Sequence, residues 1–174
     1  MALGAPEPLT AHHDLSQFAS GKIALDDWLK KRALSNQEKG FSAVVVVCDD
    51  HRVAGYYALA PTAVSPVSLP RSARTGQPPD PIPCILLGQL AVDMAYAGKG
   101  VGTGLLKHAY ARALKAAELI GGRALLVNAV DDEALAFWER REFKQTKDDR
   151  YVLFRATASV ARSVRPDQPG RTNV

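Results

Sequence analysis

A glycine at every second position, at residues 98, 100, 102 and 104, constrains this chain more than any other sequence feature. An apolar run over residues 85–92 precedes the glycines, and apolar residues recur at helical spacing after them. The segment therefore predicts a buried strand, a tight loop and the start of a helix. Because glycines leave backbone N–H groups uncovered where a helix begins, the loop is suited to binding phosphate oxygens.

The spacing of these glycines excludes two familiar phosphate-binding motifs. No Gly-Lys-Ser/Thr sequence closes the loop, as it would in a Walker P-loop. The repeat at i, i+2, i+4 and i+6 after a mid-chain strand also differs from the dinucleotide fingerprint. A plain strand-to-helix turn would need only one or two glycines, so the pattern favours an anion-binding loop of another kind.

Length and composition are typical of one globular domain without a membrane span. The 174 residues, of which 47% are hydrophobic, are enough to bury a single core. The sequence has no run of 18 apolar residues, and its first residues lack the pattern of a signal peptide. Cys48 and Cys84 lie in apolar runs and are expected to be buried thiols, so we expect a cytoplasmic location. We expect no metal, and place the His12–His13 pair on the surface.

The charge is modestly basic, and part of it lies at the end of the chain. Lys and Arg total 22 against 18 Asp and Glu, a net charge of +4, which permits a nucleic-acid partner without proving one. After Phe154, arginines alternate with Ser, Pro, Gly and Asn. We therefore expect residues 1–156 to form the domain and residues 157–174 to form a basic, flexible tail.

Hydrophobic periodicity predicts an α/β or α+β protein. A central strand–helix–strand unit implies a parallel pair with a right-handed crossover, and flanking hairpins imply antiparallel pairs. The sheet should therefore be mixed. The expected elements outside this unit are helices near 14–17 and over 23–37 and 131–141, strands over 42–48, 52–60 and 123–130, a loop over 61–83, and a closing hairpin of 142–146 with 151–155.

The glycine loop resembles a known coenzyme site. Gly98-Lys99-Gly100-Val101-Gly102, preceded by Leu90-Ala91-Val92-Asp93, is similar to the acetyl-CoA pyrophosphate loop of GNAT acetyltransferases. Ala97 stands where that family has Gln or Arg, whereas Gly100 and Gly102 match. The resemblance implies the GNAT fold, which is a mixed central sheet with a splayed parallel strand pair and flanking helices. It also implies acetyl-CoA as co-substrate.

Five other segments narrow the resemblance to the GNAT toxins of bacterial toxin–antitoxin pairs. These enzymes acetylate the α-amine of aminoacyl-tRNA and thereby block translation. The likeness implies a ribbon-helix-helix antitoxin as partner and, by analogy, a homodimer. The matching segments are residues 25–37, 55–60, 81–93, 123–127 and 132–140.

The resemblance assigns the coenzyme to the backbone of one strand, the glycine loop and the far side of the cleft. Trp138 stands where the family has a tyrosine, whose hydroxyl acts as general acid toward the sulfur. An indole N–H can donate a hydrogen bond to a thiolate but does not protonate it. The expected coenzyme contacts are Leu90, Ala91, Val92, Gly98, Lys99, Gly100, Val101, Gly102, Thr103, Asn128, Asp131 and Phe137.

An α-amine acceptor suits a site in which no base is evident. An α-amine has a pKa near 7.7–8.0, so roughly a tenth is neutral at pH 7, against well under a thousandth of a lysine amine. Asp26 and Asp27 are either orienting carboxylates or ordinary first-turn helix charges. Another set of residues is expected either to contact tRNA phosphates or to form a solvated basic face. These residues are Lys30, Lys31, Arg32, Arg71 and Arg74.

Three functions therefore remain open on the sequence. The first is an acetyltransferase acting on aminoacyl-tRNA as a toxin. The second is an acetyltransferase for another small or peptide amine. The third is a toxin relative that binds acetyl-CoA without turnover, because Ala97 and Trp138 both depart from the family pattern.

Overall fold

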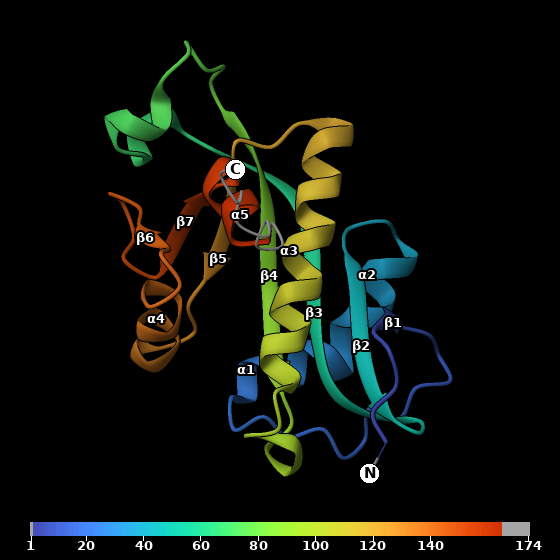
Figure 1. Ribbon diagram of the computed structural model, residues 1–174. Coiled ribbons are helices and arrows are strands. Elements are labelled where there is room, and N and C mark those ends of the chain that lie inside the picture. Colours follow the sequence, from blue (N-terminus) through green and yellow to red (C-terminus); the bar gives the residue numbers. More distant parts are fainter. Residues whose placement is uncertain (1, 165–174) are drawn as a thin grey trace, which may run out of the picture.

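A seven-stranded mixed sheet of order β1-β2-β3-β4-β5-β7-β6 runs through the computed structural model, which describes residues 2–164 (Figure 1). Only β4 and β5 pair in parallel, and every other neighbouring pair is antiparallel. The predicted mixed sheet is thus confirmed. The strands are β1 (Glu7–Pro8), β2 (Ala43–Asp49), β3 (Arg52–Val64), β4 (Ile82–Val92), β5 (Ala124–Asn128), β6 (Lys144–Gln145) and β7 (Val152–Ala156).

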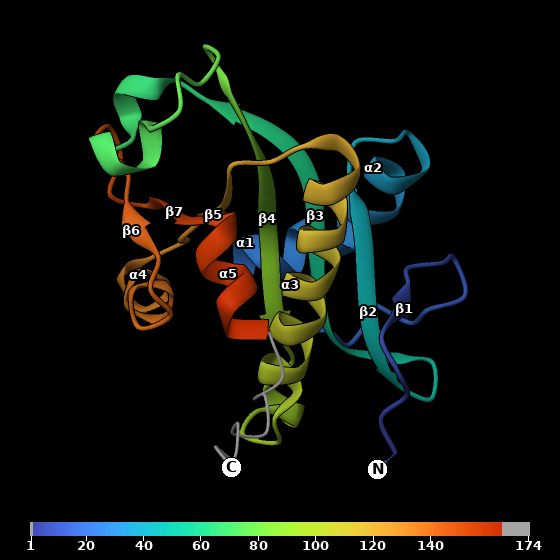
Figure 2. The same cartoon turned by 45° about the horizontal axis from the view of Figure 1, so that its top comes forward.

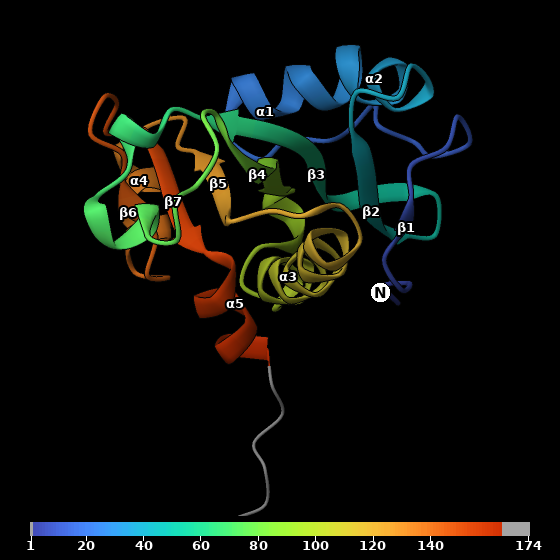
Figure 3. The ribbon, with the colours of Figure 1, turned by 90° about the horizontal axis from the view of Figure 1, so that it is seen from above.

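Helices cover both faces of the sheet (Figure 3). The predicted helix over 23–37 consists of α1 (Ile23–Trp28), a π-helical turn η1 (Leu29–Ala33) and α2 (Leu34–Glu38), and it lies on one face. The opposite face carries α3 (Val101–Ile120) and α5 (Thr157–Val164). The remaining helices are α4 (Asp132–Glu139) and the 3-10 turns η2 (Pro66–Ser68), η3 (Arg71–Arg74) and η4 (Met94–Tyr96).

The strand alternation explains why two cores form. Val44 and Val46 of β2 pack in a cluster with Leu25 and Leu29 of the α1–η1 helix. Val45 and Val47 point to the other face, into the cluster that contains α3. Successive side chains of a strand point to opposite faces, so a run of valines is buried on both sides.

Two expectations about the termini differ from the structure. The short helix near 14–17 is absent, because the Asp14 carboxylate accepts hydrogen bonds from the Ser16 N–H and hydroxyl in a turn. The expected tail starts with a helix, α5, which lies beside α3 (Figure 2). Val160 of α5 is 1% exposed, so this apolar contact extends the domain beyond residue 156. Residues 165–174 of the predicted tail lie outside the described residues.

Two properties expected of the whole chain are seen in the described part. Within residues 2–164, no helix has the length and apolar content needed to cross a membrane. Both cysteines, Cys48 and Cys84, are buried and unpaired. Burial raises the pKa of the Cys48 thiol to about 11, so this cysteine behaves as a small apolar core residue.

Candidate active site

Strands β4 and β5 separate at the centre of the sheet. They pair only over Ile85–Leu87 and Leu125–Val127, although β4 continues to Val92. The register between β3 and β4 shifts so that Gly88 has no partner, which is a β-bulge. Beyond the bulge, the β5-facing edge of Leu90–Val92 has no strand neighbour among residues 2–164. Its backbone groups on that edge are therefore available to a ligand.

A cavity of about 220 Å³ lies where the two strands have parted. One wall is formed by Leu90, Ala91 and Val92 of β4, and the facing wall by Phe137 and Trp138 of α4. The structure thus brings together the predicted strand contacts and the predicted α4 aromatics. The residues that sequence reasoning missed complete the lining and are Ser20, Lys22, Leu25, Val130, Glu133, Ala134 and Arg140.

The glycine loop presents backbone donors at the start of α3. Gly98 and Gly100 have φ angles of 74° and 79°, which glycine adopts without strain, and residues 97–100 are exposed. The first intrahelical bond runs from Gly104 N to Gly100 O at 3.0 Å. The N–H groups of Val101, Gly102 and Thr103 precede it and point out of the helix end, where an anion is favoured. Gly104 therefore lies outside this set of donors.

Gly55 of β3 allows α3 to start close to the sheet. A Cβ at this position would lie 2.7 Å from Leu105 Cδ1 and 3.1 Å from Val101 Cγ1. It would also lie 3.2 Å from the Ala91 carbonyl oxygen, a backbone atom that cannot turn away. This close approach fixes where the helix start stands relative to β4. In the sequence, Gly55 is one residue of the matching segment 55–60, and nothing near it indicates this packing role.

Trp138 is held rigidly in an aromatic cluster. Its ring makes edge contacts with Phe137 and Phe143, at centroid distances of 4.9 and 5.1 Å, and 6% of the residue is exposed. The guanidinium of Arg141 stacks over the Phe137 ring, with its carbon 3.5 Å from the ring centroid. The indole is therefore both part of the core and part of the cavity wall.

Three charged groups form an ion-pair cluster across the cavity mouth. Lys22, which precedes α1, places its Nζ 2.7 Å from Asp131 Oδ2 and 3.1 Å from Glu133 Oε2. Asp131 is the N-cap of α4, and its Oδ1 accepts from the Ala134 N–H at 2.9 Å. The hydrogen bond with Asp131 raises the pKa of Lys22, and that with Lys22 lowers the pKa of Asp131. We call Lys22, Asp131 and Glu133 the Lys22 cluster.

The other predicted acidic and polar residues have local partners. Asp26 accepts hydrogen bonds from the Ser20 N–H at 3.0 Å and from the Ser20 hydroxyl at 2.6 Å. It therefore positions a residue of the cavity wall. Asp27 lies 3.5 Å from Lys31 in an i,i+4 ion pair, as a helix surface charge does. Asn128 pairs with Val152 at the end of β5 and is not part of the cavity lining.

The predicted basic residues lie on two separate elements. Lys30, Lys31 and Arg32 are exposed on the π-helical turn η1. Arg71 and Arg74 belong to η3, in the segment that packs beside the β6–β7 connection through a hydrogen bond from Lys147 N to Ser68 O. Arg74 is half-buried on this 3-10 turn, which lies within the predicted loop over 61–83.

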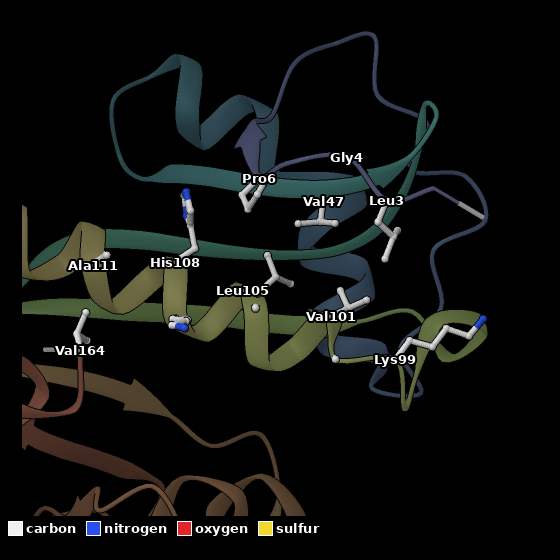
Figure 4. Close-up of a pocket in the computed structure, with 13 residues that line it drawn as sticks. Leu3, Gly4, Pro6, Val47, Lys99, Val101, Leu105, His108, Ala111 and Val164 are labelled. Carbon is white, nitrogen blue, oxygen red and sulfur yellow. The ribbon is translucent and has the colours of Figure 1, made fainter. Parts of the chain in front are cut away.

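A second, apolar cavity of about 560 Å³ adjoins the glycine loop on its other side. Figure 4 places Leu3, Pro6 and Val47 across from Val101 and Leu105 of α3. His108 also lines it, and its Nδ1 lies 2.7 Å from the buried Tyr57 hydroxyl. This cavity shares no lining residue with the one between β4 and β5. It does share Gly100 with the glycine loop.

One group of metal-ligand types occurs among the described residues, formed by Glu7, His13 and Cys48 within 4.8 Å. The Thr10 N–H donates to His13 Nδ1 at 2.9 Å, so the neutral ring carries its proton on Nε2. That Nε2 lies 2.9 Å from Glu7 Oε1 and donates to it. The imidazole is thus fully used in hydrogen bonds. Its side chain is 8% exposed, which corrects the expected surface position of His13.

Comparisons with known proteins agree with this geometry. Residues 40–145 match the family model described as an acetyltransferase (GNAT) domain. The chain is 44% identical over 145 residues to the tRNA-acetylating toxin of Mycobacterium tuberculosis strain ATCC 25618 / H37Rv, covering 83% of this chain and 87% of the relative.

Two solved structures of the toxin AtaT are similar along nearly the whole chain. AtaT complexed with acetyl-methionyl-tRNAfMet has a TM-score of 0.84 and 27% identity, covering 93% of this chain and 99% of that chain. A mutant of AtaT bound to acetyl-CoA and the C-terminus of the antitoxin AtaR has a TM-score of 0.78 and 27% identity, covering 94% and 98%. With its glycine loop, its parted strands and these relatives, the chain belongs to the GNAT acetyltransferase family.

Proposed function

We propose that this protein transfers the acetyl group of acetyl-CoA to the α-amine of aminoacyl-tRNA and acts as a translation-blocking toxin. The observation that carries the proposal is the cavity between the parted strands β4 and β5, which is lined by Trp138. The similarity to a tRNA-acetylating toxin supports the choice of acceptor. The similar structure of AtaT complexed with acetyl-methionyl-tRNAfMet also supports aminoacyl-tRNA as the acceptor.

The coenzyme contacts are mostly backbone groups. The pyrophosphate would accept from the N–H groups of Val101, Gly102 and Thr103 and lie next to Gly98, Lys99 and Gly100. The pantetheine and the thioester oxygen would bind the open edge of Leu90–Val92. Phe137 would enclose the thioester from the α4 side. Asp131 bonds to Lys22, so we move it from the coenzyme contacts to the acceptor side.

The reaction needs a neutral amine beside the thioester carbon and a stabilised thiolate. The amine nitrogen forms a bond to the carbonyl carbon and the carbon–sulfur bond breaks. The nitrogen loses one proton to water, and the sulfur gains one proton. Trp138 would donate its indole N–H to the developing thiolate and thereby stabilise its charge. Because the indole keeps its proton, water would protonate the sulfur in this protein.

Two substitutions test the role of Trp138. Trp138→Phe removes the N–H donor and retains an aromatic ring, so kcat should fall about tenfold with the KM values unchanged. Trp138→Tyr supplies a hydroxyl that can act as general acid, so kcat should equal or exceed that of the native protein. Equal kcat for the native protein and both variants would assign Trp138 to packing alone.

The proposal itself is tested with charged tRNA and labelled acetyl-CoA. We expect the label on the amino group of the aminoacyl ester, and none on uncharged tRNA. A panel of small amines and peptides without RNA tests the second function, which robust turnover unaffected by tRNA would favour. Binding of acetyl-CoA without turnover of any acceptor would favour the third function.

We further propose a cytoplasmic protein that an antitoxin of the ribbon-helix-helix class neutralises and that forms a homodimer. The AtaT structure with the C-terminus of AtaR supports the antitoxin partner. The dimer is an analogy with the resembling toxins. Co-expression with a gene encoding such an antitoxin, followed by size-exclusion chromatography, measures both associations.

A further inference from the structure

The Lys22 cluster places an ammonium group between two carboxylates at the mouth of the cavity. Lys22 and Glu133 both line the cavity, and they come from the start of α1 and from α4. The lysine Nζ is 2.7 Å from Asp131 Oδ2 and 3.1 Å from Glu133 Oε2. These ion pairs join the start of α1 to the start of α4. The protein therefore holds an amine of its own beside the place where the acceptor amine must enter.

The carboxylate of Asp131 is positioned for this task before any ligand arrives. Its Oδ1 is occupied by the N-cap hydrogen bond from Ala134 N, so Oδ2 faces the ammonium in a fixed geometry. Exposure does not separate the partners, since the side chains of Lys22, Asp131 and Glu133 are 28%, 42% and 83% exposed. The anchoring does, because the N-cap bond holds Asp131 whereas the Lys22 ammonium ends a flexible four-carbon stem. Lys22 can therefore turn to solvent while Asp131 stays in place.

We propose that Asp131 and Glu133 form the receiving site for the α-ammonium group of the acceptor, and that Lys22 occupies this site as an internal competitor until the acceptor displaces it. The bound ammonium then loses one proton to water, and the neutral amine that results reacts with the thioester. The inference rests on the proposed function, because it assumes an amine acceptor at this mouth. Exchange of one ammonium for another leaves no carboxylate unpaired, so the step avoids the cost of an uncompensated charge. An acceptor with no amine gains nothing from the exchange.

The exchange predicts opposite effects for the two sides of the cluster. Lys22→Met removes the competitor, so the KM for aminoacyl-tRNA should fall by about 2- to 5-fold, the range that exposed ion pairs cover. Asp131→Asn and Glu133→Gln remove the receiving charges, so each should raise that KM by about 2- to 5-fold, the same range for exposed ion pairs. Asn is as good an N-cap as Asp, so Asp131→Asn preserves the start of α4. The KM for acetyl-CoA should change in none of them.

A matched control variant tests whether loss of any exposed lysine has the same effect as loss of Lys22. A binding measurement tests the ammonium site independently of catalysis. Lys115→Met removes an exposed lysine on α3, a helix that contributes no residue to the lining of this cavity, and should leave all constants unchanged. In the binding arm, affinities for aminoacyl-tRNA and for the same tRNA carrying a hydroxyacyl ester are compared without acetyl-CoA. The native protein should prefer the amine, and the Asp131→Asn, Glu133→Gln double variant should lose that preference.

Each outcome has one meaning. If Lys22→Met raises the KM for aminoacyl-tRNA as the carboxylate variants do, the cluster only braces the two walls and the inference is wrong. If the native protein binds both esters equally, the inference is also wrong, whatever the activity. A retained amine preference without any label on aminoacyl-tRNA would instead overturn the proposed function and leave the ammonium site supported.

Discussion

The glycine loop proposed to bind the coenzyme and the Lys22 cluster proposed to receive the acceptor are built from different parts of the protein. The first, which we call the coenzyme end, is residues 97–104 and offers backbone N–H groups of consecutive residues. The acceptor end is the Lys22 cluster, in which side chains 109 residues apart in sequence meet across the mouth. A backbone site tolerates changed side chains, such as Ala97 in place of the family's Gln or Arg. A side-chain site depends on each group, so changes at the two ends should have different signatures.

The largest expected effect comes from placing a negative charge in the glycine loop. Gly100→Asp adds a carboxylate where the pyrophosphate is proposed to bind, at a residue with φ of 79°. Two like charges about 4 Å apart repel by about 1–4 kcal/mol, depending on screening, which is about 5-fold to nearly 1,000-fold in affinity. The KM for acetyl-CoA should rise by this range, and titration calorimetry should show the same loss of binding.

Gly100→Asn is the matched control, because Asn has the same shape as Asp and tolerates positive φ. It should raise the KM for acetyl-CoA only a few-fold. Equal losses for Asp and Asn would mean that shape or backbone strain, and not anion binding, governs position 100. In both variants the KM for aminoacyl-tRNA should stay near its native value, because the acceptor end is untouched.

The second effect tests the acceptor surface beyond the cluster. The triple variant of Lys30, Lys31 and Arg32 to Ala removes three exposed charges from η1 and retains good helix formers. If each contacts one phosphate, the slope of log KM for aminoacyl-tRNA against log salt should become about 2 to 3 shallower. The measurement is a steady-state salt series with the acetyl-CoA concentration held saturating.

The control for this variant removes three exposed lysines elsewhere, Lys39, Lys115 and Lys144. It lowers the net charge equally, so an identical change in slope would indicate general electrostatic attraction and contradict a localised tRNA surface. Because Lys31 also pairs with Asp27 at 3.5 Å, a Lys31 single variant should contribute less than Lys30 or Arg32.

The third effect concerns the packing that holds the coenzyme end in place. In Gly55→Ala, the new Cβ would lie 2.7 Å from Leu105 Cδ1 and 3.2 Å from the Ala91 carbonyl oxygen. Such overpacking costs about 1–3 kcal/mol, and the melting temperature should fall by roughly 2–12 °C. Gly104→Ala meets no atom within 4 Å and should be neutral or stabilising. If Gly55→Ala melts like the native protein, β3 and α3 have more room than the structure implies.

The difference between the two ends also explains what could be predicted from the sequence. The glycine loop and the mixed sheet follow from local spacing, which is why their positions agree closely with expectation. The Lys22 cluster was missed because nothing near Lys22 in the sequence indicates a partner 109 residues away. Asp131 was expected to contact the coenzyme, and only its role as N-cap could be inferred locally.

Two further features, the helix α5 and the conformation of Glu142, could not be predicted from composition. The composition of α5 predicts a tail because small and basic residues surround Val160, yet Val160 is buried in the core and Val164 packs against it. Glu142 has a φ of 66°, a left-handed conformation that glycine adopts without strain and other residues rarely adopt. The Glu142 carboxylate bonds the buried Arg155 at 2.9 Å, which offsets part of that strain.

The smallest expected effect is a pH dependence of stability at the second cavity, beside the coenzyme end. Burial, and then the charge of Arg112, lower the pKa of His108 below its ordinary value of 6.5. Below pH 6.5 the unfolded chain therefore binds more protons at this site than the folded protein does, so folding stability falls as the pH falls. Above 6.5 both states are neutral and the effect vanishes.

The difference in melting temperature between pH 7.5 and pH 5.5 isolates this contribution when the native protein is compared with His108→Gln. Gln keeps a hydrogen-bond acceptor for the Tyr57 hydroxyl but has no proton to gain in this range. The native protein should therefore lose slightly more of its melting temperature over this range than the variant. Equal losses would mean that His108 gains its proton as easily in the folded protein as in the unfolded chain. In that case water reaches the imidazole through the apolar cavity that His108 lines.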